Sequence, residues 1–311
     1  MGKTAFLFPG QGAQYSGMGQ ELYNNFSIVR ETLDRVDEIL GFNMLDIIFK
    51  GEEKELKRTE NTQPAIFAVS IAVLRLLEQS GINADAAVGL SLGEYSALTA
   101  SDVLKYEDAL PLVRMRGKFM QEAVPEGVGT MAAIIGLDRE ALQEVLIEAS
   151  EKGIVEAVNF NCPGQVSIAG EIPAVEAAVE IAKAKGAVKA VMLQVSAPFH
   201  SSMLKSAGDN LNKGLRDIKF SKACLPVIAN IDGDYYKFKD EEIVDKLTRQ
   251  VYSPVLFEDS IVRLINTGFD TFVEVGPGRA LSGFVKRISK SARILNVEDT
   301  KSLEKTISSL S

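Results

Sequence analysis

The stretch DAAVGLSLGEYSALTA, residues 85–100, joins a short apolar segment to a helical one through a Gly-x-Ser-x-Gly pattern centred on Ser91. The apolar run predicts a buried strand that leads directly into Ser91, and the segment after it predicts a helix. Glycine at positions 89 and 93 allows the strand and the helix to approach closely around one sharp turn. This context is typical of a nucleophile elbow, in which the serine hydroxyl stands clear of the chain and the helix N-terminus faces developing negative charge. The other interpretation is a small serine buried at a tight turn.

The rest of the chain predicts strands that alternate with helices. Outside residues 127–196 this alternation indicates an α/β fold with a mostly parallel sheet covered on both faces. One of the helices is expected to start at an Asn61 or Thr62 cap, with Pro64 in its first turn. Residues 127–196 predict the order strand, helix, strand, strand, helix, strand, which is the ferredoxin-like arrangement. We therefore expect a core of residues 1–126 and 197–311 and a small inserted subdomain at residues 127–196.

A serine nucleophile needs a base, and the chain has a single histidine, His200, in the segment SAPFHSSM. If a serine–histidine pair operates here, His200 is its only candidate. The alternatives are a structural or solvent-exposed histidine, with a lysine base or an aspartate dyad doing the chemistry. No carboxylate is marked by a motif as a third member. A backbone carbonyl or a side-chain amide could orient the imidazole instead, because the orienting group only has to fix the tautomer and the ring.

Arg116 interrupts an apolar face of a predicted helix. Spacings of three and four residues place it on one stripe with Ala109, Leu112, Val113, Phe119, Met120 and Ala123. A buried arginine needs an anion, since an unpaired buried charge is costly. That anion is either an internal carboxylate or a substrate carboxylate gripped through two parallel hydrogen bonds. A third interpretation is a guanidinium that extends along the apolar surface to water.

The glycine-rich loop PGQGAQ follows the first predicted strand. Such a turn frees backbone N–H groups, and the N–H of Gln11 could complete an oxyanion hole with that of Leu92. Phosphate binding is the competing interpretation. The loop has no Gly-Lys-Ser/Thr sequence, and its spacing does not match Gly-x-Gly-x-x-Gly, so we favour the oxyanion hole.

Composition limits the partners and the location that we expect. A formal net charge of −8 over 311 residues argues against broad binding of nucleic acid or anionic membranes. The two cysteines, Cys162 and Cys224, are far apart, and with one histidine they offer no metal-ligand cluster. The sequence shows no signal peptide and no apolar stretch long enough to span a bilayer. We expect a cytoplasmic protein without a metal, and a monomer by default.

Several blocks in order resemble the malonyl-CoA:acyl carrier protein transacylases of bacterial fatty-acid synthesis and the acyltransferase domains of polyketide synthases. The likeness covers essentially the whole chain. The blocks are FLFPGQGAQ, GLSLGEYSAL, VRMRGKFMQEAVPEGVGTMAAIIGL, VNFNCPGQVSIAG, SAPFHSSML, LTRQVYSPV and VEVGPGRALSGFVKRI. The resemblance implies an α/β-hydrolase-like core with a ferredoxin-like insert, in agreement with the pattern of predicted elements.

The same resemblance assigns roles to residues of this chain. Ser91 would be the acylated nucleophile and His200 its base. Arg116 would hold the free malonyl carboxylate, and the backbone N–H groups of Gln11 and Leu92 would form the oxyanion hole.

Four further positions follow from the family pattern. The backbone carbonyl of Gln250 would orient the imidazole, and Asn159 would lie near the pocket. Phe199 matches the malonyl-selective pattern, because a ring there leaves less room for an α-methyl branch, although one methyl group changes specificity only modestly. Leu90 departs from the family, which usually has histidine immediately before the serine. That histidine is not the general base, so the departure concerns the polarity of the pocket, and with it the rate or the acyl preference.

The reaction implied by the resemblance transfers a malonyl group from malonyl-CoA to the phosphopantetheine thiol of acyl carrier protein, with no cofactor besides the coenzyme A thioester. Acyl carrier proteins are acidic, so an acidic chain needs a local basic surface to bind them. Two clusters are available: Lys286, Arg287, Lys290 and Arg293 in one, and Lys183, Lys185 and Lys189 in the other. The alternative for each residue is an ordinary solvated helix face.

Three rival functions remain open. The first is an esterase or thioesterase on the same core, although α/β-hydrolases usually place histidine late in the chain and about a third of this chain follows His200. The second is a binding or scaffold protein that keeps the fold, against which the intact set of Ser91, His200 and Arg116 argues. The third is a stand-alone acyltransferase that serves a polyketide synthase.

Overall fold

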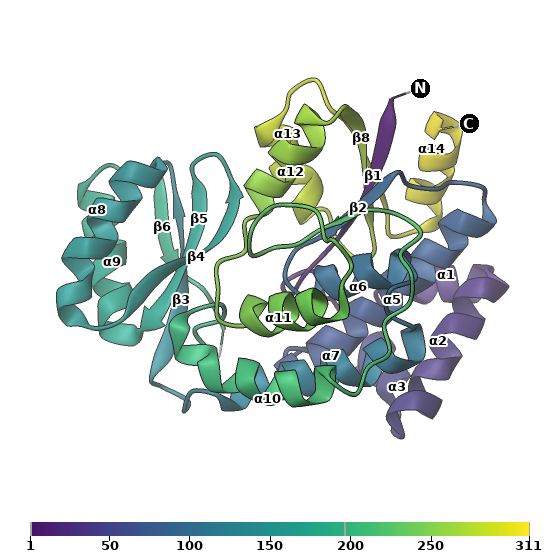
Figure 1. Ribbon diagram of the computed structural model, residues 1–311, viewed down its shortest axis with the longest axis horizontal. Coiled ribbons are helices and arrows are strands. Elements are labelled where there is room, and N and C mark those ends of the chain that lie inside the picture. The colour runs from purple at the N-terminus through teal and green to yellow at the C-terminus, as the bar shows by residue number, and fades with distance from the viewer. Residues whose placement is uncertain (1, 196, 311) are drawn as a thin grey trace.

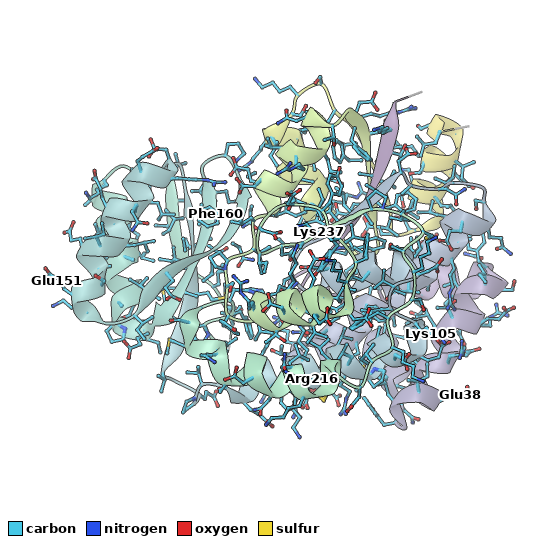
Figure 2. The ribbon with its side chains drawn as sticks, viewed as in Figure 1. Glu38, Lys105, Glu151, Phe160, Arg216 and Lys237 are labelled. Atoms are coloured by element: carbon cyan, nitrogen blue, oxygen red, sulfur yellow. The ribbon has the colours of Figure 1, made fainter. Side chains whose placement is uncertain are left out.

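The computed structural model describes residues 2–195 and 197–310. Figure 1 shows two regions: an antiparallel sheet with two helices at the left, and a parallel sheet with the remaining helices at the right. Charged side chains such as Glu38 and Glu151 are exposed at the edge of the molecule (Figure 2). No helix in the described part of the chain is long and apolar enough to cross a membrane.

Five strands form the parallel sheet in the order β7-β2-β1-β8-β9. Their bounds are β1 Lys3–Phe8, β2 Ala86–Gly89, β7 Val227–Ile228, β8 Phe269–Val275 and β9 Arg293–Val297. Every neighbouring pair is parallel. The expectation of a mostly parallel sheet is therefore confirmed. Because β1 is central, the loops that follow β1 and β2 lie side by side, where Phe8 pairs with Gly89.

Helices cover both faces of this sheet, as the sequence predicts. The helices of this region are α1 Gln20–Asn25, α2 Ser27–Leu40, α3 Met44–Lys50, α4 Glu53–Leu56, α5 Thr59–Gln79, α6 Gly93–Ala100, α7 Tyr106–Glu122, α10 Lys205–Leu215, α11 Asp240–Gln250, α12 Phe257–Asn266, α13 Ala280–Ile288 and α14 Thr300–Leu310, with the 3₁₀ turn η2 Ser202–Leu204 before α10. Alternate residues of β1 belong to two apolar clusters: Phe6 and Phe8 pack with α5, whereas Ala5 and Leu7 share a cluster with α12 and α13.

The predicted cap of α5 is wrong. The helix begins at Thr59, so Asn61, Thr62 and Pro64 already lie inside it. The side chains of Asn61 and Thr62 instead donate to the carbonyls of Glu55 and Leu56 in the preceding helix α4. These hydrogen bonds join α5 to α4. In sequence, such polar side chains before an apolar helical run look the same as an N-cap.

The second sheet is antiparallel, with strand order β4-β5-β3-β6. Its elements follow the chain as β3 Gly129–Ile135, α8 Arg139–Ala149, η1 Ser150–Lys152, β4 Val155–Cys162, β5 Gln165–Glu171, α9 Ile172–Ala184 and β6 Lys189–Met192. This is the ferredoxin-like arrangement, and it has its own apolar cluster. The boundaries at residues 126/127 and 196/197 stay a prediction, and residues 1, 196 and 311 lie outside the described residues.

A short contact ties β4 to the parallel region. Phe160 N–H donates to the Val255 carbonyl at 2.9 Å, and Val255 N–H donates to the Val158 carbonyl at 2.8 Å. Val255 lies between α11 and α12, so β4 at the edge of the second sheet is fixed beside the segment that joins these two helices. Residues of both regions line the cavity that contains Ser91.

Candidate active site

The turn between β2 and α6 holds Ser91 in a left-handed backbone conformation, with φ of 54°. Such a conformation is uncommon for any residue but glycine and persists where the surroundings enforce it. A Cβ on Gly89 would fall within 3.0 Å of the Gly93 backbone, and one on Gly93 within 3.0 Å of the Phe8 carbonyl. Glycine at both positions therefore lets strand, helix and the β1 loop meet around Ser91, which is the elbow geometry that the sequence predicts.

Two side chains hold the backbone of the elbow. Ser91 N–H donates to Oδ1 of Asn230 at 2.7 Å, and the Ser91 carbonyl accepts from Nε2 of Gln250 at 2.9 Å. Asn230 also donates to the Gly89 carbonyl at 2.7 Å. Sequence reasoning missed Asn230, because it follows β7 in a segment without a motif.

His200 lies directly against the serine. Its Nε2 is 2.7 Å from Ser91 Oγ, and its Nδ1 is 2.7 Å from the backbone carbonyl of Gln250. A carbonyl can only accept, so the proton of the neutral ring is on Nδ1 and Nε2 is free to accept from the serine hydroxyl. The structure thus places Gln250 where the family pattern expects the orienting carbonyl.

The electrostatics of His200 favour the neutral imidazole. Burial, together with the nearby charge of Arg116, lowers the pKa of His200 to about 3. The ring is therefore unprotonated at neutral pH, which is the form that a general base requires. His200 also has a left-handed backbone, with φ of 65°, so both members of the pair are held in strained conformations.

Arg116 projects from α7 to the other side of the same hydroxyl. Its Nη2 donates to Ser91 Oγ at 3.0 Å and to Oε1 of Gln250 at 2.9 Å, while Nη1 donates to Oε1 of Gln63 at 2.7 Å. The guanidinium is fully buried, so it does not extend to water. Among the described residues it makes no ion pair with a carboxylate, which is evidence against the internal salt bridge as well. Sequence reasoning missed Gln63, a polar residue in an otherwise apolar helix.

The predicted oxyanion-hole groups lie together. Gln11 and Leu92 both line a cavity of about 260 Å³ that Ser91 and His200 also line. In residues 2–195 and 197–310 neither backbone N–H donates to a protein acceptor. Two free N–H groups beside a serine hydroxyl are what a developing oxyanion needs. Their role stays a prediction.

The remaining predicted residues line the same cavity. Asn159 comes from β4, Phe199 precedes the histidine, and Leu90 contributes its side chain next to the serine. Leu90 also packs against the apolar cluster of α12 and α13, so the wall beside Ser91 is apolar here. Asn161 and Ser167, on β4 and β5, line the cavity too and were not predicted.

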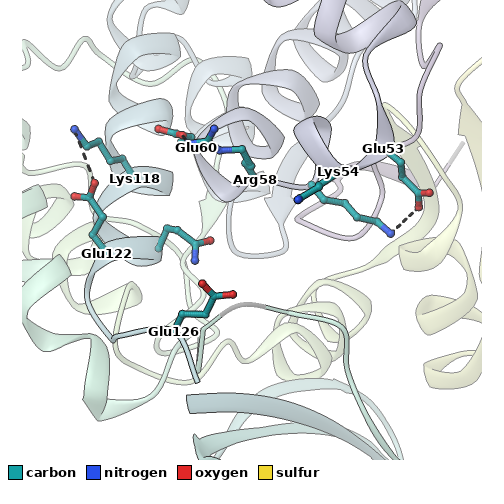
Figure 3. A pocket seen from close by; sticks show the side chains of 9 residues that line it. Glu53, Lys54, Arg58, Glu60, Lys118, Glu122 and Glu126 are labelled. Atoms are coloured by element: carbon teal, nitrogen blue, oxygen red, sulfur yellow. Dashed lines mark hydrogen bonds and ion pairs between the residues drawn. The ribbon is translucent and has the colours of Figure 1, made fainter. Parts of the chain in front are cut away.

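Figure 3 shows a second cavity of about 730 Å³ that does not contain the serine, the histidine or the arginine. Its charged residues are balanced, four basic against four acidic: Lys54, Lys57, Arg58 and Lys118, and Glu53, Glu60, Glu122 and Glu126. Three ion pairs already join Lys57 to Glu53, Arg58 to Glu60 and Lys118 to Glu122. Ser91 and His200 line the smaller cavity, which is therefore the candidate site. Arg116 is not one of its lining residues and reaches it through Ser91 and Gln63, to which it donates.

Fold and site together are those of an α/β protein in which a serine at an elbow contacts a buried histidine, an arrangement typical of enzymes that act on acyl groups. Comparison with known proteins shows which family the chain matches. The family model described as "Acyl transferase domain" matches residues 5–307. The malonyl CoA-acyl carrier protein transacylase of Bacillus subtilis (strain 168) is 46% identical over 311 residues, covering 100% of this chain and 98% of the relative. The chain belongs to the acyl transferase family.

Solved structures agree over the whole chain. A malonyl CoA-acyl carrier protein transacylase from Clostridium perfringens superposes with a TM-score of 0.95 at 48% identity, covering 99% of this chain and 97% of that one. A type II PKS acyl-carrier protein in complex with its malonyl-transacylase gives a TM-score of 0.96 at 40% identity, covering 99% of each chain. The second structure is of a complex with a carrier protein.

Proposed function

We propose that this protein transfers the malonyl group of malonyl-CoA to the phosphopantetheine thiol of acyl carrier protein, through a malonyl ester on Ser91. One observation carries the proposal: the serine hydroxyl is 2.7 Å from a neutral histidine and 3.0 Å from a fully buried arginine that has no carboxylate partner among the described residues. The first contact supports a nucleophile, and the second supports an acyl group that carries its own carboxylate. The names of the relatives, malonyl CoA-acyl carrier protein transacylases, support the second point.

In the first half-reaction Nε2 of His200 takes the hydroxyl proton as Oγ of Ser91 attacks the thioester carbonyl. The carbonyl oxygen becomes an oxyanion and accepts hydrogen bonds from the N–H groups of Gln11 and Leu92. The C–S bond then breaks, and the coenzyme A thiolate takes the proton from His200. A malonyl-serine ester and free coenzyme A result.

The second half-reaction is the reverse of the first, with the phosphopantetheine thiol in place of coenzyme A. His200 takes the proton of the phosphopantetheine thiol, and the sulfur attacks the ester carbonyl. The Ser91–acyl bond breaks, and Oγ takes the proton back. The proposed reaction needs only the two thiols and the acyl group, and this protein itself contributes no metal or prosthetic group.

The distal carboxylate of the malonyl group explains how the serine ester would avoid hydrolysis. In the free protein Nη2 of Arg116 donates to Ser91 Oγ, so an acyl group bound to that oxygen brings its distal carboxylate close to the guanidinium. Two parallel hydrogen bonds would then hold the ester in a fixed pose and exclude attacking water.

We propose the basic end of α13 as the surface that receives the carrier protein. The helix contributes Ala280, Leu281 and Phe284 to the cavity wall, and its exposed last turn carries Lys286 and Arg287. The cluster on and after α9 is less suited, because two of its members already pair with acidic residues of α8 and α9. A related malonyl-transacylase in complex with an acyl-carrier protein supports a carrier as partner.

We propose fatty-acid synthesis in the cytoplasm as the setting, with the protein acting as a monomer. A carrier of a polyketide synthase is the second candidate acceptor, because one solved relative is in complex with such a carrier. Steady-state rates at several concentrations of malonyl-CoA and of each holo-carrier test the ester intermediate and the identity of the acceptor. Parallel double-reciprocal lines support the ester intermediate, intersecting lines contradict it, and the higher kcat/KM identifies the acceptor.

A further inference from the structure

Among the described residues no carboxylate contacts Arg116 directly. A second buried charged group, Glu94, is joined to it through one intervening side chain. Glu94, in the first turn of α6, is fully buried and makes no ion pair among the described residues. Two buried opposite charges in one network are each costly if left alone. The reaction described above gives Glu94 no role, so its presence beside the elbow needs an explanation.

Three donors converge on the Glu94 carboxylate. The Tyr236 hydroxyl donates to Oε1, while Asn230 N–H at 3.1 Å and Nε2 of Gln250 at 2.6 Å donate to Oε2. Burial raises the pKa of Glu94 to about 7, while these donors and the charge of Arg116 act to lower it. The three hydrogen bonds each favour the ionised carboxylate and so oppose the larger effect of burial on its pKa.

The Gln250 side chain joins the two charges. Its Nε2 donates to Glu94, and its Oε1 accepts from Arg116 at 2.9 Å. The amide therefore transmits the orientation of the carboxylate to the guanidinium. The same residue accepts from His200 through its backbone carbonyl and donates to the Ser91 carbonyl, so Gln250 contacts Ser91, His200 and Arg116.

A neutral amide between the charges has a chemical consequence. A carboxylate in direct contact with Arg116 would occupy the donors that a substrate carboxylate needs, and would compete with it. A carboxylate one amide away offsets the buried positive charge without taking those donors. Glu94 thus stabilises an arginine that is charged and oriented, and whose Nη1 and Nη2 donate only to neutral groups that compete with a substrate carboxylate less than an internal carboxylate would.

We propose that Glu94 is a positioning residue for transfer of carboxylated acyl groups, acting on Arg116 through the side-chain amide of Gln250. The inference rests on the proposed function and deepens it, because it adds a group that determines selectivity without touching the substrate. It distinguishes Glu94 from a merely structural glutamate: loss of the carboxylate lowers malonyl transfer far more than acetyl transfer.

The test compares single-turnover acylation of Ser91 by malonyl-CoA and by acetyl-CoA, followed by intact mass. For Glu94→Gln we expect the ratio of malonyl to acetyl rate constants to fall by at least about tenfold. The matched control is Glu242→Gln, the same chemical change on α11, where the carboxyl pairs with Lys246 and accepts from Lys237 N–H. It should leave the ratio within about twofold.

A second variant covers the case in which Glu94→Gln does not fold. Gln250→Met removes the amide bridge but keeps the backbone carbonyl that orients His200, and it should lower the same ratio. Circular dichroism and thermal melting check folding. An unchanged ratio in the folded variants overturns the proposal for Glu94, provided that the wild-type protein forms malonyl-Ser91. If the wild-type protein forms no such ester, the proposed function fails instead.

Discussion

Replacing Arg116 with alanine removes the guanidinium beside Ser91 and should abolish the preference for malonyl over acetyl groups that the proposed function implies. A hydrogen bond to a charged group contributes about 1.5–3 kcal/mol, so two parallel bonds to the malonyl carboxylate contribute about 3–6 kcal/mol. At about 1.4 kcal/mol for each factor of ten, kcat/KM for malonyl-CoA should fall by about 10²- to 10⁴-fold.

Acetyl-CoA lacks the carboxylate and should respond in the opposite direction or not at all. The charge of Arg116 helps to lower the pKa of His200, so its removal raises the basicity of the imidazole. Acetylation of Ser91 should therefore hold or rise in the same variant.

The assay is release of coenzyme A with each donor, normalised to active sites by intact mass. Arg114→Ala is the matched control, because Arg114 lies on the same helix but packs over the Phe42 ring, 4.6 Å from its centroid. It should change neither donor's kcat/KM beyond about threefold. Equal losses for malonyl-CoA and acetyl-CoA in Arg116→Ala would refute the carboxylate role, since a general disturbance of the elbow would then account for both.

Four further outcomes follow from the site and its surroundings. The imidazole ¹⁵N resonances of His200, the single histidine, should show no protonation between pH 5 and 8; a titration near the ordinary value of about 6.5 would contradict its buried, neutral state. Because the unfolded chain takes up a proton that the native ring does not, His200 should make the free energy of unfolding fall as the pH drops below about 6.5, measurable by urea denaturation. Gly93→Ala should cost at least about 2 kcal/mol of stability and abolish acylation, because the added Cβ would clash with the backbone of Phe8. Gly283→Ala has open space around the added Cβ and should be neutral or stabilising by up to about 1 kcal/mol. Charge reversal at Lys286 and Arg287 should raise KM for the carrier protein and leave acylation by malonyl-CoA unchanged; an unchanged carrier KM would place the docking surface elsewhere.

The elbow could be predicted from sequence because its determinants are local. A strand, a Gly-x-Ser-x-Gly turn and a helix lie within residues 85–100, and the close approaches at Gly89 and Gly93 depend on those few residues and the adjacent β1 loop. Arg116 was found for a similar reason, since a charge on an apolar helical stripe is visible in the periodicity alone. The parallel sheet likewise follows from the alternation of apolar strands with helices.

The network around the nucleophile could not be predicted, because its contacts are distant in sequence. Asn230 meets Ser91 across 139 residues, and Gln250 meets Glu94 across 156. Asn230 lies in no motif, and the family resemblance assigns a role only to the backbone carbonyl of Gln250, not to its side chain. A glutamate in the first turn of a helix is ordinarily explained by the helix dipole. Only the fold shows that Glu94 is buried and that three donors converge on it.

The central claim is tested most directly by incubating the protein with malonyl-CoA, measuring its intact mass and locating the adduct by peptide mapping. The account predicts one malonyl group on Ser91 that is stable in buffer and is discharged when holo-acyl carrier protein is added. Discharge to water alone would indicate a hydrolase. An adduct on another residue, or none in a protein that still binds malonyl-CoA, would contradict the assignment of Ser91 as the nucleophile.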